Sequence, residues 1–293
     1  MNILSFDIEE WFFEKGGVNN DWKFDQLNEM LDRILLLLQS KKISATFFCL
    51  GEMAIDFPDV IKKIASFGHE IGCHSMKHHW VNKMSSKEFY KDTQTAMEVI
   101  EKIIDNKVIS YRSPAFSITE KSKWAFDILA DLGIKNDASI FPTSRDFGGY
   151  KGYPAINKPS KIILDKGASI TEFPINITRL PIINKEIAYS GGGYFRLLPL
   201  SFIKKRISNS EYTMCYFHLG DLVDYETPLM SKKEYEDYFK EPGTLKNRYL
   251  RYFKSNIGRT RAFKGLKDLI NSYDFISVKE AAKSNINFQE ISL

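Results

Sequence analysis

Short apolar runs alternate with longer amphipathic stretches along the first half of the chain. The short runs are rich in β-branched and aromatic residues, which predicts buried strands at residues 2–6, 44–50, 70–73, 108–111 and 135–139. Apolar residues recur at helical spacing over residues 24–39, 53–67, 85–104 and 119–132. This order of strand and helix predicts parallel strands joined by crossover helices.

The pattern loosens after residue 140. Further strands are expected at residues 169–174 and 213–218, a helix at 255–272 and a last strand at 274–278. The chain has no internal repeat, low-complexity segment or linker. We therefore predict one domain over residues 1–293, with an elaboration around 140–212 and a C-terminal segment, 213–293, that completes it.

Composition changes this picture little. The chain has 293 residues, a formal net charge of +4 and 43% hydrophobic residues, which is typical of a globular protein with a large core. The basic stretch 246–261 could meet an anionic surface or substrate, although such stretches are more often solvated helix faces. No nucleic-acid motif accompanies it, so we expect no nucleic-acid partner. The longest apolar run, 34–38, is too short to span a membrane.

Cysteine usage and the N-terminus bear on the compartment. Cys49, Cys73 and Cys215 each lie in an apolar run, which is typical of buried thiols in a reducing compartment. The chain begins with a predicted strand and shows no basic region followed by an apolar one, as a secretory signal would. We therefore expect a cytoplasmic protein.

Ionisable residues stand where the predicted strands end. They are Asp7, His74, Arg112, Asp137 and His218. The carboxyl ends of parallel strands in a barrel meet on one face, where active sites form. We therefore expect these five side chains to lie together.

Two short motifs could bind a metal. Asp7 and Glu9 point the same way from an extended strand, and two such carboxylates can divide labour if one meets a cation and the other acts as a base. His74 and His78 are four residues apart, so on a helical turn both imidazoles would face one divalent ion. A carboxylate would complete a catalytic site. A chance cluster of core histidines is the alternative, and His79 is expected to be structural or to support one of the ligands.

Three later residues have both a chemical and a structural interpretation. Arg112 could grip a carboxylate while Pro114 stiffens its loop, or it could form a surface ion pair. Asp137 could orient another side chain, or it could be a turn residue. His218 is suited to general acid catalysis, or it could be a core histidine bonded to backbone.

Taken in order, these segments resemble the polysaccharide deacetylase family, the NodB-type carbohydrate esterases. That family has a base aspartate in its first motif, His-Ser/Thr-x-x-His in its second, Arg-x-Pro in its third, and a late histidine acid. The matching residues are Asp7, His74 with His78, Arg112 with Pro114, and His218. The segment 191–199, GGGYFRLLP, resembles the branch with a C-terminal extension found in exopolysaccharide, capsule and O-antigen biosynthesis.

The resemblance implies a distorted (β/α) barrel of about seven parallel strands and a metal-dependent hydrolase that removes an N-acyl group, acetyl above all, from an amino sugar. It implies Asp7 as the base, Arg112 as its holder and His218 as the acid. It also implies a divalent ion, with Zn²⁺ expected, on Glu9, His74 and His78. The usual first motif is Asp-Asp, so the Asp7-Ile8-Glu9 triplet places a longer side chain at the ligand position.

The expected substrate is an amino sugar carried on a nucleotide, a lipid or an oligosaccharide. Its candidate contacts, beyond a backbone amide near residues 115–116 for the oxyanion, are Trp11, Pro114, Phe116, Gly192, Gly193 and Tyr194. The three-glycine segment could equally be a turn that requires positive φ, and the aromatic residues could equally be core packing. Asp137 or Asp221 is expected to orient His218.

Two other functions remain open. One is a metal-free hydrolase of the same fold that opens a cyclic amide such as allantoin. The other is an inactive relative that binds a glycan or scaffolds a biosynthetic complex. The set of Asp7, His74 and His78 argues against the first, and the presence of both a candidate base and a candidate acid argues against the second. A chelator would abolish activity only in the metal-dependent enzyme.

Overall fold

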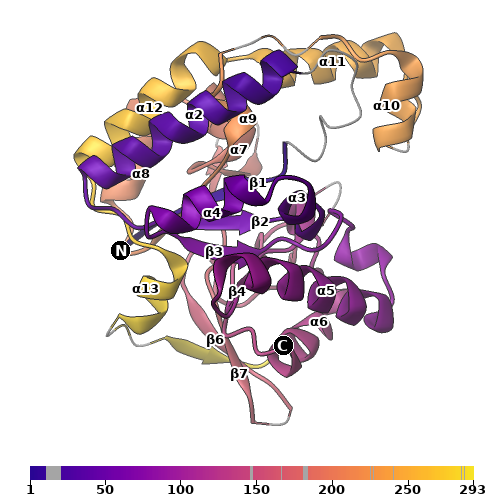
Figure 1. Cartoon of the computed structure of the whole chain (residues 1–293), viewed down its shortest axis with the longest axis vertical. Coiled ribbons are helices and arrows are strands. Elements are labelled where there is room, and N and C mark those ends of the chain that lie inside the picture. Colours follow the sequence, from indigo (N-terminus) through magenta and orange to yellow (C-terminus); the bar gives the residue numbers. More distant parts are fainter. Residues whose placement is uncertain are drawn as a thin grey trace.

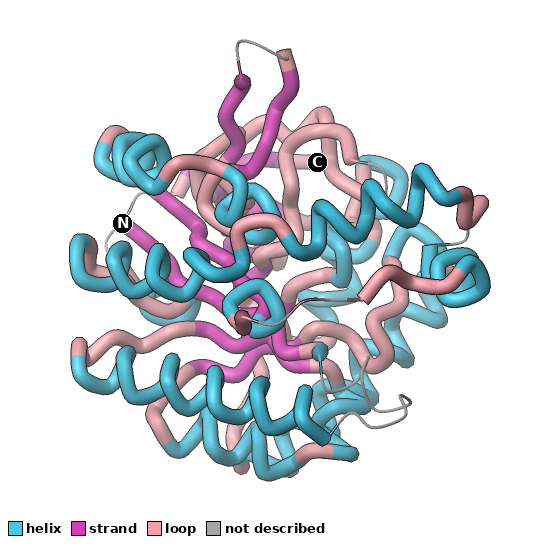
Figure 2. Tube along the Cα trace, turned by 90° about the horizontal axis from the view of Figure 1, so that it is seen from above, coloured by secondary structure: helices cyan, strands magenta, loops and turns pink. Residues whose placement is uncertain are grey.

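The computed structural model describes residues 1–10, 21–145, 148–165, 167–180, 184–224, 226, 228–239, 241–284, 286 and 288–293. Figures 1 and 2 show a central group of strands with helices packed around it. None of the helices within these ranges combines the length and apolarity that crossing a membrane requires. All three cysteines are buried free thiols, as predicted.

Seven parallel strands form the main sheet, as the resemblance implied. Their order is β10 (Thr213–His218), β1 (Asn2–Ile8), β2 (Thr46–Cys49), β3 (Glu70–Cys73), β4 (Ser110–Tyr111), β5 (Asn136–Asp137) and β7 (Ser169–Glu172). Two strands extend the sheet beyond β7: β6 (Ser160–Ile163), which is antiparallel to it, and β11 (Gln289–Ile291). A separate ribbon pairs β8 (Ile177–Leu180) with β9 (Lys185–Ala188).

A buried side chain closes the gap between β7 and β10. Within the part of the chain that the structure describes, no strand pairing joins these two strands. Instead, the Asn176 side chain donates to the carbonyl of Tyr212 at 3.0 Å and accepts from the amide of Met214 at 2.7 Å. The Tyr212 hydroxyl donates to the carbonyl of Pro174 at 2.8 Å. The result is a barrel distorted at this seam.

The helices lie around the barrel, and most of them pack against it. They are α2 (Asp21–Ser40), α3 (Gly51–Asp56), α4 (Pro58–Ser66), α5 (Ser86–Ile104), α6 (Ala125–Asp131), α7 (Gly192–Leu197), α8 (Leu200–Ser208), α9 (Leu219–Leu222), α10 (Lys232–Phe239), α11 (Leu245–Asn256), α12 (Arg259–Ser272) and α13 (Val278–Lys283). Three 3₁₀ turns are η1 (Val81–Lys83), η2 (Pro114–Phe116) and η3 (Glu120–Ser122).

Side-chain alternation along β1 decides which residues reach the interior of the barrel. Leu4 and Phe6 pack into the larger apolar cluster with residues from the helices, and Phe6 stacks on Phe47 with ring centroids 4.9 Å apart. Ile3 belongs to a second, smaller cluster. Because alternate strand residues share a face, Ser5 and Asp7 point to the same side as Ile3. The strand pattern therefore aims Asp7 into the barrel.

Several predicted elements differ from the structure at identifiable residues. The helix expected over 53–67 is two helices, because Pro58 has no N–H to continue the first one. The helix expected over 255–272 begins only at Arg259, after Gly258 with φ 73°. The strand expected at 274–278 is wrong, since Ile276 makes a single bridge to Ile3 and α13 follows. The helix expected over 85–104 is confirmed as α5, which begins with a capping box formed by Ser85 and Glu88.

A stability prediction comes from the glycine segment before α7. Gly191 is extended (φ 177°), and a Cβ there would lie on the carbonyl oxygen of Tyr216 in β10, far inside van der Waals contact. We expect Gly191→Ala to lower the free energy of unfolding by about 2–3 kcal/mol, because rigid backbone must shift. Gly193→Ala is the matched control, since the nearest atom to its Cβ would be Arg196 Nη2 at 3.7 Å, an ordinary contact distance. Chemical denaturation measures both, and equal stabilities of the two variants would contradict this account.

Candidate active site

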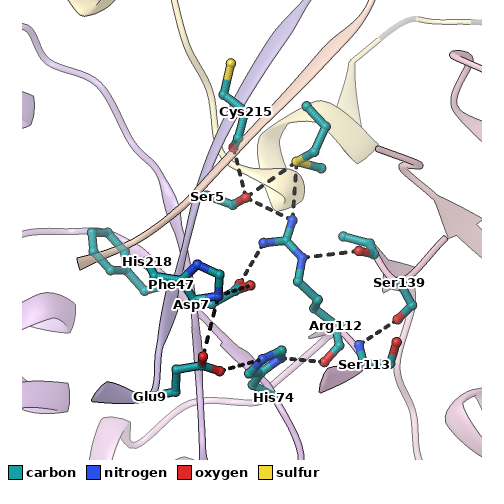
Figure 3. A network of polar contacts seen from close by, with 12 residues as sticks. Ser5, Asp7, Glu9, Phe47, His74, Arg112, Ser113, Ser139, Cys215 and His218 are labelled. Atoms are coloured by element: carbon teal, nitrogen blue, oxygen red, sulfur yellow. Dashed lines mark hydrogen bonds and ion pairs between the residues drawn. The ribbon is translucent and has the colours of Figure 1, made fainter. Parts of the chain in front are cut away.

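Four of the five strand-end residues converge on one point inside the barrel mouth. Asp7 lies near the end of β1 and His218 at the end of β10, and the two are paired in register. His74 follows β3 and Arg112 follows β4. Figure 3 shows these side chains, together with Glu9, pointing toward one another. The structure thus brings together four of the five residues that were expected to meet, without Asp137.

Arg112 is the fully buried centre of this cluster. Its guanidinium donates to Asp7 Oδ1 at 2.7 Å, to Ser5 Oγ at 2.9 Å and to the carbonyl of Ala138 at 3.2 Å. It also lies 4.3 Å from the centroid of the Phe48 ring. These contacts fix Oδ1 of Asp7, so its other oxygen, Oδ2, faces His218 Nε2 at 3.9 Å.

Glu9, His74 and His78 form a group with the geometry of metal ligands. Oε2 of Glu9 lies 3.3 Å from His74 Nε2 and 3.0 Å from His78 Nε2. Two donors about 2.1 Å from one ion in tetrahedral geometry lie roughly 3.4 Å apart, so these separations suit a shared divalent cation. Oε2 is buried and accepts no hydrogen bond of good geometry, as expected of an oxygen that awaits a cation.

A second contact prepares His74 for this role. Its Nδ1 lies 2.8 Å from the carbonyl oxygen of Arg112. Because a carbonyl can only accept, Nδ1 carries the proton and the lone pair of Nε2 points to Glu9. Imidazole nitrogens and a carboxylate oxygen are the donor set of catalytic zinc and related divalent ions. The residues present therefore fit a metal, whose identity the donors alone do not fix.

The two histidines come together in a different way from the one expected. The prediction of a helical turn over residues 74–78 is wrong, because Ser75 (φ 71°) and His78 (φ 61°) adopt left-handed conformations. The Ser75 hydroxyl accepts from the amide of His78 at 2.9 Å and closes the turn. Asp92 of α5 accepts from the amide of Met76 at 2.9 Å and anchors it. His79 is exposed, 3.8 Å from Asp92.

His218 is held by two groups from the C-terminal half of the chain. Its Nδ1 lies 3.1 Å from Asp221 Oδ2, and Asp221 Oδ1 lies 3.1 Å from Arg196 Nε. Burial favours neutral His218, but the carboxylates of Glu9, Asp221 and Asp7 outweigh it and raise its pKa well above the usual value. A cation bound at Glu9 would remove part of that effect, whereas Asp221 would keep its share.

The charged groups around His218 also affect the pKa values of Glu9 and Glu10. Burial opposes ionisation of Glu9, but the charges of His78 and His218 hold its pKa well below the usual value. The neighbouring Glu10 accepts from the amide of Gly220. Burial raises the pKa of Glu10 to about 7. Glu10 thus ties β1 to α9, a contact that the sequence did not reveal.

Of the two carboxylates considered for orienting His218, only Asp221 contacts its ring. Asp137 is instead fully buried, where its carboxylate accepts from the Ser139 hydroxyl at 2.7 Å and the Ser139 amide at 3.0 Å. Its other partner is Glu172 of β7. Burial and the charge of Asp137 raise the pKa of Glu172 well above the usual value, and burial raises the pKa of Asp137 as well. The neighbouring strand, not the distant His218, thus supplies the partner of Asp137.

The remaining candidate residues fall in different places. Pro114 and Phe116 are buried in η2, and both Ala115 and Phe116 have positive φ. The amide of Phe116 donates to the carbonyl of Ser113 at 3.1 Å, so of the two amides considered for an oxyanion it is already engaged. Trp11 lies outside the described residues.

The glycine segment packs on β10. Gly191 bridges Tyr216, Gly192 is buried with φ 57°, Gly193 is exposed and Tyr194 is half-buried. Positive φ at Gly192 is what the turn interpretation required. Arg196 lies in this same segment, but sequence reasoning missed it because only contact with Asp221 reveals its role.

The metal ligands can be tested without an assay of activity. We expect Glu9→Gln and His78→Ala each to weaken binding of a divalent ion at least about a hundredfold, because each removes one of three convergent donors. His79→Ala, the adjacent exposed histidine, should bind as the parent does. Competition with a chromophoric chelator measures the affinities. Unchanged affinity in Glu9→Gln would remove Glu9 from the ligand set.

Comparison with known proteins agrees with this geometry. Residues 14–136 match the family model described as polysaccharide deacetylase, and residues 138–283 match a domain of unknown function, DUF3473. Over 98 residues the chain is 34% identical to a peptidoglycan-N-acetylglucosamine deacetylase of Bacillus cereus, which covers 33% of this chain and 36% of that protein. Over 90 residues it is 31% identical to the peptidoglycan-N-acetylmuramic acid deacetylase PdaC of Bacillus subtilis. That match covers 31% of this chain and 19% of PdaC. The chain thus spans about a third or less of the length of these two relatives.

Solved structures support the fold. A Mycobacterium smegmatis structure of the polysaccharide deacetylase class has a TM-score of 0.62 at 16% identity, covering 96% of this chain and 88% of that one. A carbohydrate esterase family 4 pseudoenzyme from Bacillus anthracis has a TM-score of 0.50 at 14% identity, covering 100% and 69%. Because a pseudoenzyme shares the fold, the fold alone does not establish activity. With the motifs in place, residues 14–136 form a polysaccharide deacetylase domain, and residues 138–283 form a DUF3473 region that follows it.

Proposed function

We propose that this protein is a metal-dependent N-deacetylase that releases acetate from an N-acetylated amino sugar during synthesis of a surface polysaccharide or its precursor. One observation carries the proposal: the ligand group of Glu9, His74 and His78 is flanked by a candidate base, Asp7, and a candidate acid, His218. A hydrolase of an unactivated amide needs all three elements, because water is a weak nucleophile and an amine is a poor leaving group.

The side chains divide the reaction as follows. Oδ2 of Asp7 takes a proton from water while the water oxygen bonds to the amide carbon. Arg112 keeps Asp7 in this orientation through its contact with Oδ1. As the C–N bond breaks, His218 Nε2 gives a proton to the departing nitrogen, and Asp221 stabilises the imidazolium through Nδ1. The products are acetate and a free amino sugar.

Glu9, His74 and His78 would hold the divalent ion, for which Zn²⁺ suits the donor set, and when bound it supplies a Lewis acid for water and the amide carbonyl. The names of the curated relatives support an N-acetylated amino sugar as the substrate class. Loss of acetate release on chelation separates this function from the metal-free cyclic-amide hydrolase and from the inactive glycan-binding relative.

The base is tested by Asp7→Asn. We expect acetate release from N-acetylated chito-oligosaccharides or nucleotide-linked amino sugars to fall by about 10³-fold, because the amide cannot take a proton from water. Metal affinity should remain within a few-fold of the parent, since Asp7 is not among the ligands. Acetate release at the parental rate would show that another group is the base.

The acid and its holders are tested with two kinds of substrate. We expect His218→Ala, Asp221→Asn and Arg196→Gln to slow hydrolysis of the amide, by about 10²-fold or more for His218→Ala. Hydrolysis of 4-nitrophenyl acetate should change much less, because nitrophenolate leaves without a proton. Arg179→Gln, an exposed arginine of β8, is the control.

The double variant Asp221→Asn/Arg196→Gln should hydrolyse the amide only slightly more slowly than Asp221→Asn alone, because Arg196 acts through Asp221. Equal losses on both substrates would show that these residues serve the fold and not the proton transfer.

A further inference from the structure

Helix α11 turns its apolar side chains to solvent and its polar ones to the body of the protein. Leu245 is 65% exposed, Tyr249 48%, Leu250 49%, Phe253 62% and Ile257, just past the helix end, 49%. At about 100° per residue these five fall within one stripe of roughly 140°. None of the residues of α11 is buried. Figure 1 shows α10 and α11 at the margin of the molecule, beyond the helices that cover the sheet.

The opposite face of α11 is polar and makes the contacts with the protein. Arg248 donates to the carbonyl of Met230 at 2.7 Å, and Arg251 lies 4.4 Å from the centroid of the Phe239 ring. A surface helix of a globular protein ordinarily has the reverse arrangement, with its apolar stripe inward. The exposed stripe therefore marks a surface that a partner covers.

The charge around this stripe is one-sided. Residues 242–267 contain eight lysines and arginines and no aspartate or glutamate. Since the whole chain carries +4, the other residues together carry −4 (4 − 8). Lys246 and Lys254 are exposed on the same side of α11 as the apolar stripe. The partner must therefore offer both an apolar phase and negative charge.

We propose that α11 docks the protein on the surface of an anionic lipid bilayer. A helix with aromatic and aliphatic side chains on one face and basic residues around it lies in the interfacial region of such a membrane. A second copy of this chain would bring two basic segments together. A polar glycan would leave the aliphatic side chains uncovered.

The docking face is connected to the catalytic acid. Arg196 donates to the carbonyls of Lys254 and Ser255 at the end of α11 and also pairs with Asp221, which contacts His218. Docking would therefore hold the site beside the bilayer, where an amino sugar on a lipid carrier is presented. This last step rests on the proposed function, whereas docking itself does not.

Vesicle co-sedimentation tests the docking. The full-length protein should pellet with phosphatidylcholine vesicles that contain phosphatidylglycerol, pellet poorly with phosphatidylcholine alone, and release as salt is raised. Leu245→Ser/Phe253→Ser/Ile257→Ser should lower the partition coefficient at least about tenfold. Lys246→Glu/Lys254→Glu should lower it as well. Ile156→Ser, an exposed apolar residue elsewhere, is the matched control.

Three results would overturn the proposal: no binding to anionic vesicles, equal binding to neutral ones, or parental binding by the triple serine variant. Parental binding is interpretable because the substituted side chains are exposed, so the variant should keep its circular dichroism and melting temperature. Recovery of an acidic protein on α11 without vesicle binding would also reject the bilayer. Because Asp7→Asn should still bind vesicles, a failed deacetylation assay and a failed docking assay are distinguishable.

Discussion

The buried Arg112 is the constraint on which the site depends. With no exposed surface, its charge must be matched inside the protein, and Asp7, Ser5, the Ala138 carbonyl and the Phe48 ring together do so. Loss of one partner of such a pair costs about 3–5 kcal/mol, because a charge is left buried. The backbone carbonyl of the same residue accepts from His74 and sets its tautomer. One residue thus fixes both the candidate base and a candidate metal ligand.

The two halves of the chain do not divide the chemistry between separate domains. The first half supplies the candidate base and the candidate ligands, and the second supplies the candidate acid, Asp221 and Arg196. Strand β10 pairs with β1 so that His218 stands opposite Asp7, and Asn176 joins β10 to the other edge of the barrel. The region called DUF3473 therefore completes both the barrel and the candidate active site.

Sequence patterns predicted the parts of this structure that local chemistry determines. Short apolar runs predicted the strands β1, β2, β3 and β10, and polar residues at strand ends marked Asp7, His74, Arg112 and His218. What escaped prediction depends on contacts between distant residues. Ser75 and His78 have left-handed backbone where a helical turn was expected. Asp137 pairs with Glu172, and Arg196 forms an ion pair with Asp221. None of these has a local signature, because spacing carries no information about a partner on another strand.

Helix α11 shows why the extension and the site should be considered together. Apolar burial does not hold this helix on the protein; hydrogen bonds do, from Arg248 to the carbonyl of Met230 near one end and from Arg196 to the helix's own carbonyls at the other. A helix attached in this way leaves its apolar stripe hydrated, which is unfavourable until another surface covers it. Because Arg196 also holds Asp221, any movement of α11 on docking would reach the acid through one side chain. The C-terminal half would then couple where the enzyme sits to how readily its leaving group is protonated.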